Sequence, residues 1–149
     1  IICKPKMWTQ DLIDNPWLLG SPTFGGNPLC CSAALATIKY MLEHDIPGVC
    51  KKKGEFLKAG LEQLAGKYPE VIMEVRGTGL MLAVEFHTSE IGYECAKGLF
   101  ARGVMTAGTL VNAKTIRFEP TAVISEQDMK DVISRMDESL ADTKKNMGL

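Results

Sequence analysis

Thr23-Phe24-Gly25-Gly26-Asn27-Pro28 stands directly before a long segment whose apolar residues recur at helical spacing. Asn27 can cap the first turn of a helix by accepting a backbone hydrogen bond, and Pro28 fits the first helical position, where a missing N–H costs nothing. We therefore expect a helix over residues 28 to about 44, mostly buried. Its apolar stripe would consist of Leu35, Ile38 and Leu42.

The same loop allows two interpretations. Free N–H groups at the first turn and the positive end of the helix dipole favour a bound phosphate or carboxylate, to which the Thr23 hydroxyl can add a hydrogen bond. The alternative is a well-capped helix that binds no ligand, since such caps are common. The loop by itself leaves both interpretations open.

Three more segments show helical spacing. The first follows a break at residues 45–47 and ends before Pro69, the second begins at Ser89 and ends at Arg102-Gly103, and the third follows a capping box at residues 125–128. Their apolar stripes are Leu57, Leu61, Leu64 and Tyr68; Ile91, Cys95, Leu99 and Phe100; and Met129, Val132, Ile133, Met136 and Leu140. We expect the polar tail from Asp142 to fray.

Between these helices the period changes to that of strands. Residues 71–76 alternate, Gly77-Thr78-Gly79 interrupts them, and residues 80–86 are almost wholly apolar. Residues 104–107 and 115–119 predict two short strands that flank a polar loop. Because a strand follows the two glycines where a dinucleotide-binding motif needs a helix, we expect a bend there. Helices before and after a small sheet predict an α+β domain, with helix and sheet in layers.

Composition argues against several classes of function. The chain has 149 residues, 46% of them hydrophobic, which is enough for one compact core. A net charge of -1, from 17 basic and 18 acidic residues, indicates neither a nucleic-acid partner nor a membrane surface, and the run Lys51-Lys52-Lys53 is explained by a solvated helix face. With no apolar segment of the roughly 20 residues that span a bilayer and no signal pattern, we expect a cytoplasmic protein.

Metal and disulfide chemistry are not indicated. The cysteines form an odd set without CxxC spacing: Cys3, Cys30, Cys31, Cys50 and Cys95. We therefore expect reduced, mostly buried thiols and no metal centre. The two histidines have no acid or cysteine partner nearby in sequence, and neither is assigned to catalysis.

Arg117 is a candidate binding residue. It lies between Ile116 and Phe118 in a short strand, so alternation sends its guanidinium to the face opposite those apolar side chains. The forked donors of arginine suit bidentate binding of a carboxylate. The alternative is an ordinary ion pair, for example with Glu119 on the same face.

Three motifs follow one another along the chain: Thr23-Phe24-Gly25-Gly26-Asn27-Pro28-Leu29, Arg76-Gly77-Thr78-Gly79-Leu80-Met81 and Ile116-Arg117-Phe118-Glu119-Pro120. Together they resemble the C-terminal portion of the class-III aminotransferases, enzymes that use pyridoxal 5'-phosphate. Within that family, residues 90–93 and 107–117 look most like putrescine aminotransferases. The resemblance covers essentially the whole chain.

The resemblance implies a fold and two site residues. Residues 1–42 would end a large cofactor-binding domain of fold type I and start a long connecting helix. Residues 43–149 would form a small C-terminal domain whose short, mostly antiparallel sheet is covered by helices. Thr23 would donate its hydroxyl to the cofactor phosphate in the neighbouring subunit of a homodimer formed through the large domain. Arg117 would hold the carboxylate of the amino-acid or 2-oxo-acid substrate.

One family residue has no counterpart here. The lysine that forms the Schiff base with the cofactor belongs to a segment that precedes the part beginning at Ile1, and no lysine here has similar surroundings. We expect this chain to be part of a longer protein, to contain no catalytic residue, and to be inactive by itself. Two positions also depart from the family pattern: Pro22 replaces a hydroxyl residue, and Thr121 replaces a proline.

The resemblance implies an activity for the longer parent protein. It would transfer an amino group from putrescine or a related ω-amine to 2-oxoglutarate. An ornithine or acetylornithine aminotransferase is the alternative within the family. A non-catalytic dimerisation or interaction domain is the alternative from another class, because it too would lack the lysine.

Overall fold

The structure is a computed structural model that describes residues 10, 14, 23–109 and 112–149. It divides into two compact units, Ile1–His44 and Asp45–Leu149, and each is described by itself. Cys3, Pro22 and the start of the chain lie outside the described residues.

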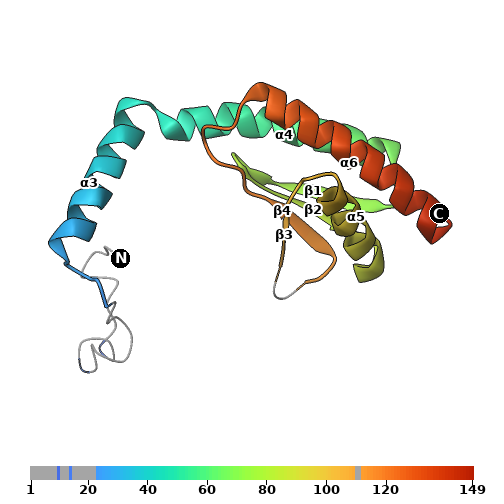
Figure 1. Ribbon diagram of the computed structural model, residues 1–149, viewed down its shortest axis with the longest axis horizontal. Coiled ribbons are helices and arrows are strands. Elements are labelled where there is room, and N and C mark those ends of the chain that lie inside the picture. The colour runs from blue at the N-terminus through green and yellow to red at the C-terminus, as the bar shows by residue number, and fades with distance from the viewer. Residues whose placement is uncertain (1–9, 11–13, 15–22, 110–111) are drawn as a thin grey trace. The chain divides into compact units, whose positions relative to one another are not determined.

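The first unit contains helix α3, Pro28–Glu43 (Figure 1). The predicted cap is confirmed: the Asn27 side chain accepts hydrogen bonds from the N–H groups of Leu29 and Cys30. The prediction of a buried helix was wrong, since no residue of α3 is buried. Apart from residues 10 and 14, the described part of this unit is the helix and the turn before it, so nothing there covers the stripe of Leu35, Ile38 and Leu42.

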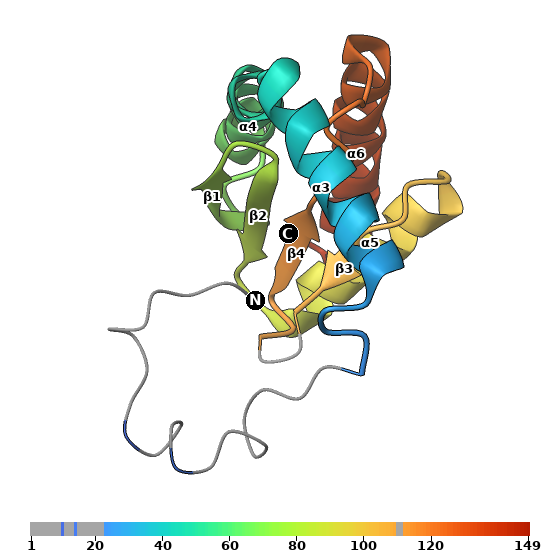
Figure 2. The ribbon, with the colours of Figure 1, turned by 90° about the vertical axis from the view of Figure 1, so that its left-hand side faces the viewer.

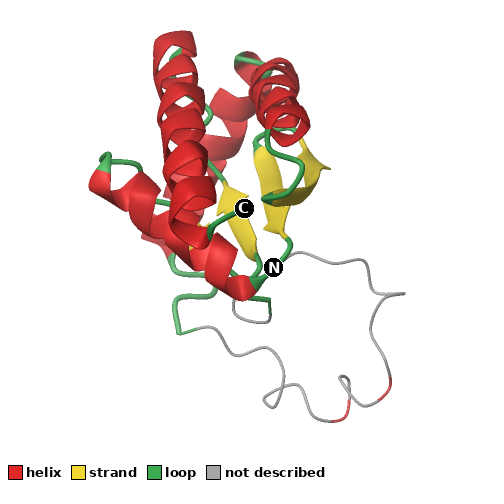
Figure 3. Cartoon of the chain, turned by 90° about the vertical axis from the view of Figure 1, so that its right-hand side faces the viewer, coloured by secondary structure: helices red, strands yellow, loops and turns green. Residues whose placement is uncertain are grey.

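The second unit is an antiparallel sheet covered by three helices. Its elements are α4 (Ile46–Lys67), β1 (Ile72–Thr78), β2 (Met81–Phe86), α5 (Ser89–Ala101), β3 (Ala107–Gly108), β4 (Thr115–Phe118) and α6 (Glu126–Met147). The strand order β1-β2-β4-β3 is visible in Figure 2. Helices α4 and α5 contact the strands, and α6 packs against both helices (Figure 3). This arrangement confirms the α+β prediction.

The core lies between the sheet and the helices. It contains the predicted stripes of α4 and α6 and the inward residues of the strands, among them Leu57, Leu61, Val84, Phe86, Ile116, Met136 and Leu140. Phe100 was wrongly placed in the α5 stripe, because its side chain is 72% exposed. Among the described helices, none is both long and apolar enough to cross a membrane.

Two glycines explain the bend between β1 and β2. Gly77 has φ +127°, and a Cβ atom there would lie 2.2 Å from the carbonyl oxygen of Met81. Gly79 has φ +52°, a region that side-chain-bearing residues rarely adopt. The predicted bend between the strands is confirmed, but it lies at Gly79 and Leu80, and Gly77 and Thr78 belong to β1.

Besides the end of β1, two element boundaries differ from prediction. Strand β3 is a two-residue strand that begins at Ala107, later and shorter than expected. Helix α6 does not end near Asp142 but continues to Met147, because its last turns have tertiary partners. Thr143 is buried, Lys144 pairs with Glu70, and Asn146 donates to Glu94.

Candidate functional site

Thr23 lies in the exposed turn at residues 23–26 that leads into α3. The N–H of Asn27 donates to the Phe24 carbonyl across this turn at 3.1 Å, and Gly26 has φ +75°. The turn therefore presents a hydroxyl and flexible backbone at the positive end of the α3 dipole.

The first turn of α3 contributes fewer free donors than the sequence suggested. Asn27 Oδ1 accepts from Leu29 and Cys30 at 3.0 and 3.3 Å, the Asn27 carbonyl accepts from Cys31 at 2.9 Å, and Pro28 has no N–H. The cap thus satisfies the N–H groups that would otherwise face an anion. An anion near this helix would depend on Thr23, the loop backbone and the dipole.

Arg117 occupies the third position of β4 and faces away from the core. Ile116 and Phe118 are buried on the opposite face, as the alternation predicted, while the Arg117 side chain is 43% exposed. Its Nη1 atom lies 3.3 Å from Oε1 of Glu119, which confirms the expected neighbour. Because this contact is long and exposed, it is worth at most about 1 kcal/mol.

The four arginines of the chain differ in how fully their donors are used. Arg76 pairs with Glu85 at 2.5 Å and Glu74 at 2.9 Å, and the hydrogen bond that it donates to Glu85 is the main cause of its raised pKa.

Arg102 likewise has two carboxylate partners, Glu138 and Asp142, and Arg135 donates to a backbone carbonyl. Arg117 pairs weakly with one carboxylate among the described residues. It is therefore better able than Arg76 or Arg102 to bind a carboxylate from outside.

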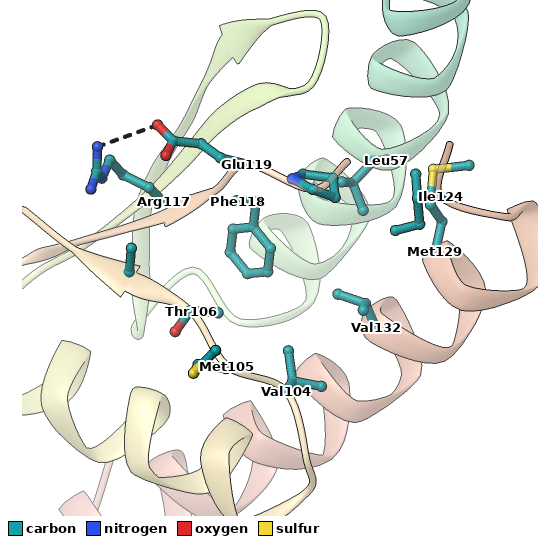
Figure 4. Close-up of a pocket in the computed structure, with 12 residues that line it drawn as sticks. Leu57, Val104, Met105, Thr106, Arg117, Phe118, Glu119, Ile124, Met129 and Val132 are labelled. Atoms are coloured by element: carbon teal, nitrogen blue, oxygen red, sulfur yellow. Dashed lines mark hydrogen bonds and ion pairs between the residues drawn. The ribbon is translucent and has the colours of Figure 1, made fainter. Parts of the chain in front are cut away.

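A shallow pocket of about 220 Å³ lies beside Arg117. Figure 4 shows Arg117 and Glu119 together at one side, with Phe118 pointing toward the apolar interior. Apolar residues from α4, α6 and the connections before β3 and after β4 form most of the wall, including Leu57, Val104, Pro120, Ile124, Met129 and Val132. The Arg117 guanidinium thus lies at the rim of the pocket and points away from its apolar wall, on the exposed face of β4, where a small carboxylate can reach it.

The sheet register places a second arginine in line with Arg117. Arg76 pairs with Ala83 across β1 and β2, Ala83 pairs with Arg117, and Arg117 pairs with Ala107 of β3. Residues directly opposite one another share a face, so the two arginines flank a small alanine. Sequence alone did not bring Arg76 and Arg117 together, because that requires the strand order.

Thr23 and Arg117 belong to different units, and the structure describes each within its own unit. Thr121, which replaces a proline of the family pattern, takes part in a turn that follows β4. The N–H of Ile124 donates to the Thr121 carbonyl at 3.0 Å, and the N–H of Val123 lies 3.4 Å from the Thr121 hydroxyl. These contacts close a turn directly after Pro120.

The cysteines differ in exposure, and only part of the expectation of buried thiols is correct. Cys30 and Cys31 are exposed rather than buried, Cys50 is half-buried and Cys95 is fully buried. Within residues 23–109 and 112–149 no three His, Cys, Asp or Glu side chains gather into a group that could hold a metal ion.

A family model described as aminotransferase class-III matches residues 7–140. The chain belongs to the class-III aminotransferase family. A putrescine aminotransferase from Pectobacterium atrosepticum is 45% identical to it over 141 residues, which cover 90% of this chain and 30% of that protein. This class-III chain thus spans less than a third of the length of that curated relative.

Solved structures agree with the family assignment. An ornithine aminotransferase from Toxoplasma gondii matches with a TM-score of 0.76 and 25% identity over 93% of this chain and 33% of that one. Its structure shows partial occupancy of pyridoxal phosphate at its active site. An acetylornithine aminotransferase from Elizabethkingia anophelis matches with a TM-score of 0.73 and 25% identity, over 83% and 32%. The fold of the class-III family is therefore shared by this chain.

Proposed function

We propose that this chain is the C-terminal portion of a pyridoxal-phosphate-dependent class-III aminotransferase that transfers an amino group from putrescine or a related ω-amine to 2-oxoglutarate. Residues 1–42 would complete the large domain and begin the connecting helix, and residues 43–149 would be the small domain. The parent would be a cytoplasmic homodimer. The similarity to a putrescine aminotransferase supports the choice of amine.

The proposal rests mainly on the exposure of the Arg117 guanidinium and on its weak pairing with Glu119. Its guanidinium is exposed on the open face of the sheet, beside an apolar pocket, with the Glu119 carboxylate at 3.3 Å. A 2-oxo acid can bind the fork through two parallel hydrogen bonds, which are stronger than the existing contact and fix the orientation of the acid. In this proposal Arg117 binds and orients the acceptor and moves no proton.

Thr23 would supply one donor to the cofactor phosphate of the neighbouring subunit. An exposed hydroxyl beside a glycine turn fits that role, and the nearby dipole of α3 favours the negative charge. When bound, pyridoxal phosphate supplies the electron sink that allows amino-group transfer. The covalent lysine and the groups that hold the ring would come from sequence that precedes Ile1 in the parent.

The first experiment is recovery of the coding sequence upstream of Ile1, followed by assay of the full-length protein. We expect a lysine segment of the family type there, and turnover of putrescine with 2-oxoglutarate. Faster turnover of ornithine or acetylornithine would select the alternative enzyme of the family. Absence of the lysine segment would favour a non-catalytic interaction domain and end the proposal.

Paired variants at the arginine test the role of Arg117 itself. Arg117→Lys keeps the charge but loses the fork, so we expect kcat/KM for 2-oxoglutarate to fall by roughly 30-fold or more, mainly through KM. Glu119→Gln removes the competing carboxylate and should change that KM by less than about fivefold, in the direction of tighter binding. Equal kinetics for Arg117→Lys and the wild-type enzyme would contradict the assigned role.

A further inference from the structure

Lys53 makes a contact that its place in a basic run does not suggest. Its ammonium donates to the carbonyl oxygens of Ala122 at 2.8 Å and Ile124 at 2.6 Å, although those residues are 69 and 71 positions away. Both acceptors belong to the connection between β4 and α6, which runs beside α4 (Figure 1). Lys53 thus joins a helix to a loop by two charge-assisted hydrogen bonds.

The other lysines of the run behave differently. Lys51 and Lys52 are exposed, as expected for a solvated face, whereas Lys53 is half-buried. The interpretation of the run as solvent-facing was therefore wrong at Lys53. A half-buried ammonium that donates to two carbonyls contributes more to stability than an ammonium that is hydrated by solvent.

The helix side of this contact is held firmly in place. Gly54 lies so close to the β1–β2 turn that a Cβ atom there would be 2.0 Å from the Gly79 carbonyl oxygen. Leu57, one turn further along α4, is 1% exposed in the core. The backbone of α4 at Lys53 is therefore fixed relative to the sheet that carries Arg117.

The loop side leads directly to the candidate site. The register between β2 and β4 ends at Phe118, so the sheet ladder does not hold Glu119. Beyond Glu119 the chain continues through Pro120 into the turn at residues 121–124, which Lys53 grips at two carbonyls. Pro120 and Ile124 line the same pocket as Arg117 and Glu119 (Figure 4).

We propose that Lys53 is a positioning residue of the acceptor-binding site: by clamping residues 122–124 to α4, it sets the position of Glu119 and the pocket wall, and with them the geometry that Arg117 offers to a carboxylate. The inference rests on the role proposed for Arg117 as the acceptor-binding group. It adds a residue far away in sequence that touches neither substrate nor cofactor.

The test uses three variants of the full-length protein. Lys53→Met keeps the stem and removes the ammonium, Lys53→Arg keeps a donor, and Lys52→Met is the matched control on the exposed face. Two kinds of measurement are made: the kinetic constants KM and kcat for 2-oxoglutarate, and amide hydrogen exchange in peptides that cover residues 119–125.

For Lys53→Met we expect exchange in residues 119–125 to rise by about tenfold or more, since the loop loses its tie. We also expect KM for 2-oxoglutarate to rise by roughly five- to tenfold, the effect of about one charge-assisted hydrogen bond, with kcat within twofold of wild type. Lys53→Arg should restore most of the KM, and Lys52→Met should change neither quantity.

The outcomes separate this inference from the proposed function. Faster exchange with an unchanged KM in Lys53→Met, while Arg117→Lys still raises KM, would overturn the positioning role and leave the proposed function intact. Unchanged exchange would show that the clamp does not hold the loop, and would also overturn it. A wild-type protein that does not transaminate, or an Arg117→Lys variant with normal KM, would remove both proposals together.

Discussion

Arginine side chains show how much of the chemistry of this chain is decided residue by residue. Arg76 and Arg102 each meet two carboxylates and act within the fold, whereas Arg117 meets Glu119 at 3.3 Å and stays exposed. The side chain is the same in each case, so the difference comes from the number of neighbouring acceptors. Availability, rather than residue type, makes Arg117 the candidate binding group.

Cysteine reactivity provides a prediction at the same scale. Cys95 is fully buried, and burial raises the pKa of its thiol to about 11, while Cys30 and Cys31 are exposed. Because the thiolate is the reactive form, iodoacetamide at pH 8 should modify Cys30 and Cys31 in the folded protein and Cys95 only in denaturant. Mass spectrometry after timed labelling measures this. Labelling of Cys95 as fast as Cys30 under native conditions would contradict the buried position.

Helix α4 is the element on which several contacts depend, and its glycines are not equivalent. Gly54→Ala would drive a Cβ into the backbone of Gly79, which cannot rotate away, so we expect a loss of about 2–3 kcal/mol in the free energy of unfolding. Gly66→Ala, in the same helix with no atom within 4 Å of the added Cβ, should stabilise by up to about 1 kcal/mol. Urea unfolding of both variants measures the difference. Similar effects would show that α4 does not approach the β1–β2 turn as described.

Helices α4 and α6 are also linked by a carboxylate whose effect depends on pH. Asp137 accepts from Lys67 and Tyr68, each at 2.7 Å, and these contacts, Lys67 first, lower its pKa. A lowered carboxyl pKa contributes stability that is fully present above the unfolded value of about 3.9 and is lost as pH falls toward the folded value.

The variant Asp137→Asn should therefore cost about 0.5–1 kcal/mol at pH 7, a small value because the pair is partly exposed, and less at pH 3. Unfolding by urea at pH 7, 5 and 3 checks this. Asp131→Asn is the control on α6, since Asp131 bonds only its helix neighbour Gln127 among the described side chains. A difference between Asp137→Asn and wild type that grows as the pH falls would contradict the assignment.

At the scale of the whole molecule, the two units differ in whether they cover their own apolar residues. The second unit encloses its own core, whereas α3 exposes its apolar stripe throughout. The proposed parent would cover that stripe with its remaining polypeptide. The chain also spans only 30% of its putrescine aminotransferase relative.

The proposal that the Schiff-base lysine lies outside this sequence leads to a prediction for the 149-residue chain itself. Mixed with pyridoxal phosphate and reduced with borohydride, the chain should show no lysine that is modified in clear preference to the others. Peptide mapping reads this out, and the full-length protein serves as the control that should label at one position. Selective labelling of one lysine in the short chain would refute the argument that its covalent anchor lies elsewhere.

Features that depend on neighbours in sequence were predicted correctly. Asn27 caps α3, Ser125 caps α6 with its Oγ 3.0 Å from the N–H of Asp128, and Gly103 ends α5 with φ +74°. The alternation around Arg117 was correct for the same reason. Caps, turns and faces follow from the geometry of three or four consecutive residues.

Features that depend on distant partners were not predicted. Three features were missed: the exposure of α3, the continuation of α6 beyond Asp142, and the contact from Lys53 to the β4–α6 connection. Each depends on whether a segment far away in the chain packs against the residues concerned. The spacing of apolar residues within one segment does not show which distant segment will pack against it.

The sequence by itself determined the family, the order of helices and strands, and the face on which Arg117 lies. These follow from motifs and from the alternation of apolar and polar side chains, which depend only on consecutive residues. Only the tertiary structure decided that Arg76 is neutralised while Arg117 stays available, and that Lys53 grips the loop behind it. The physical reason is that an ion pair or hydrogen bond depends on distance in space, which is set by the packing of α4 and the strand order of the sheet.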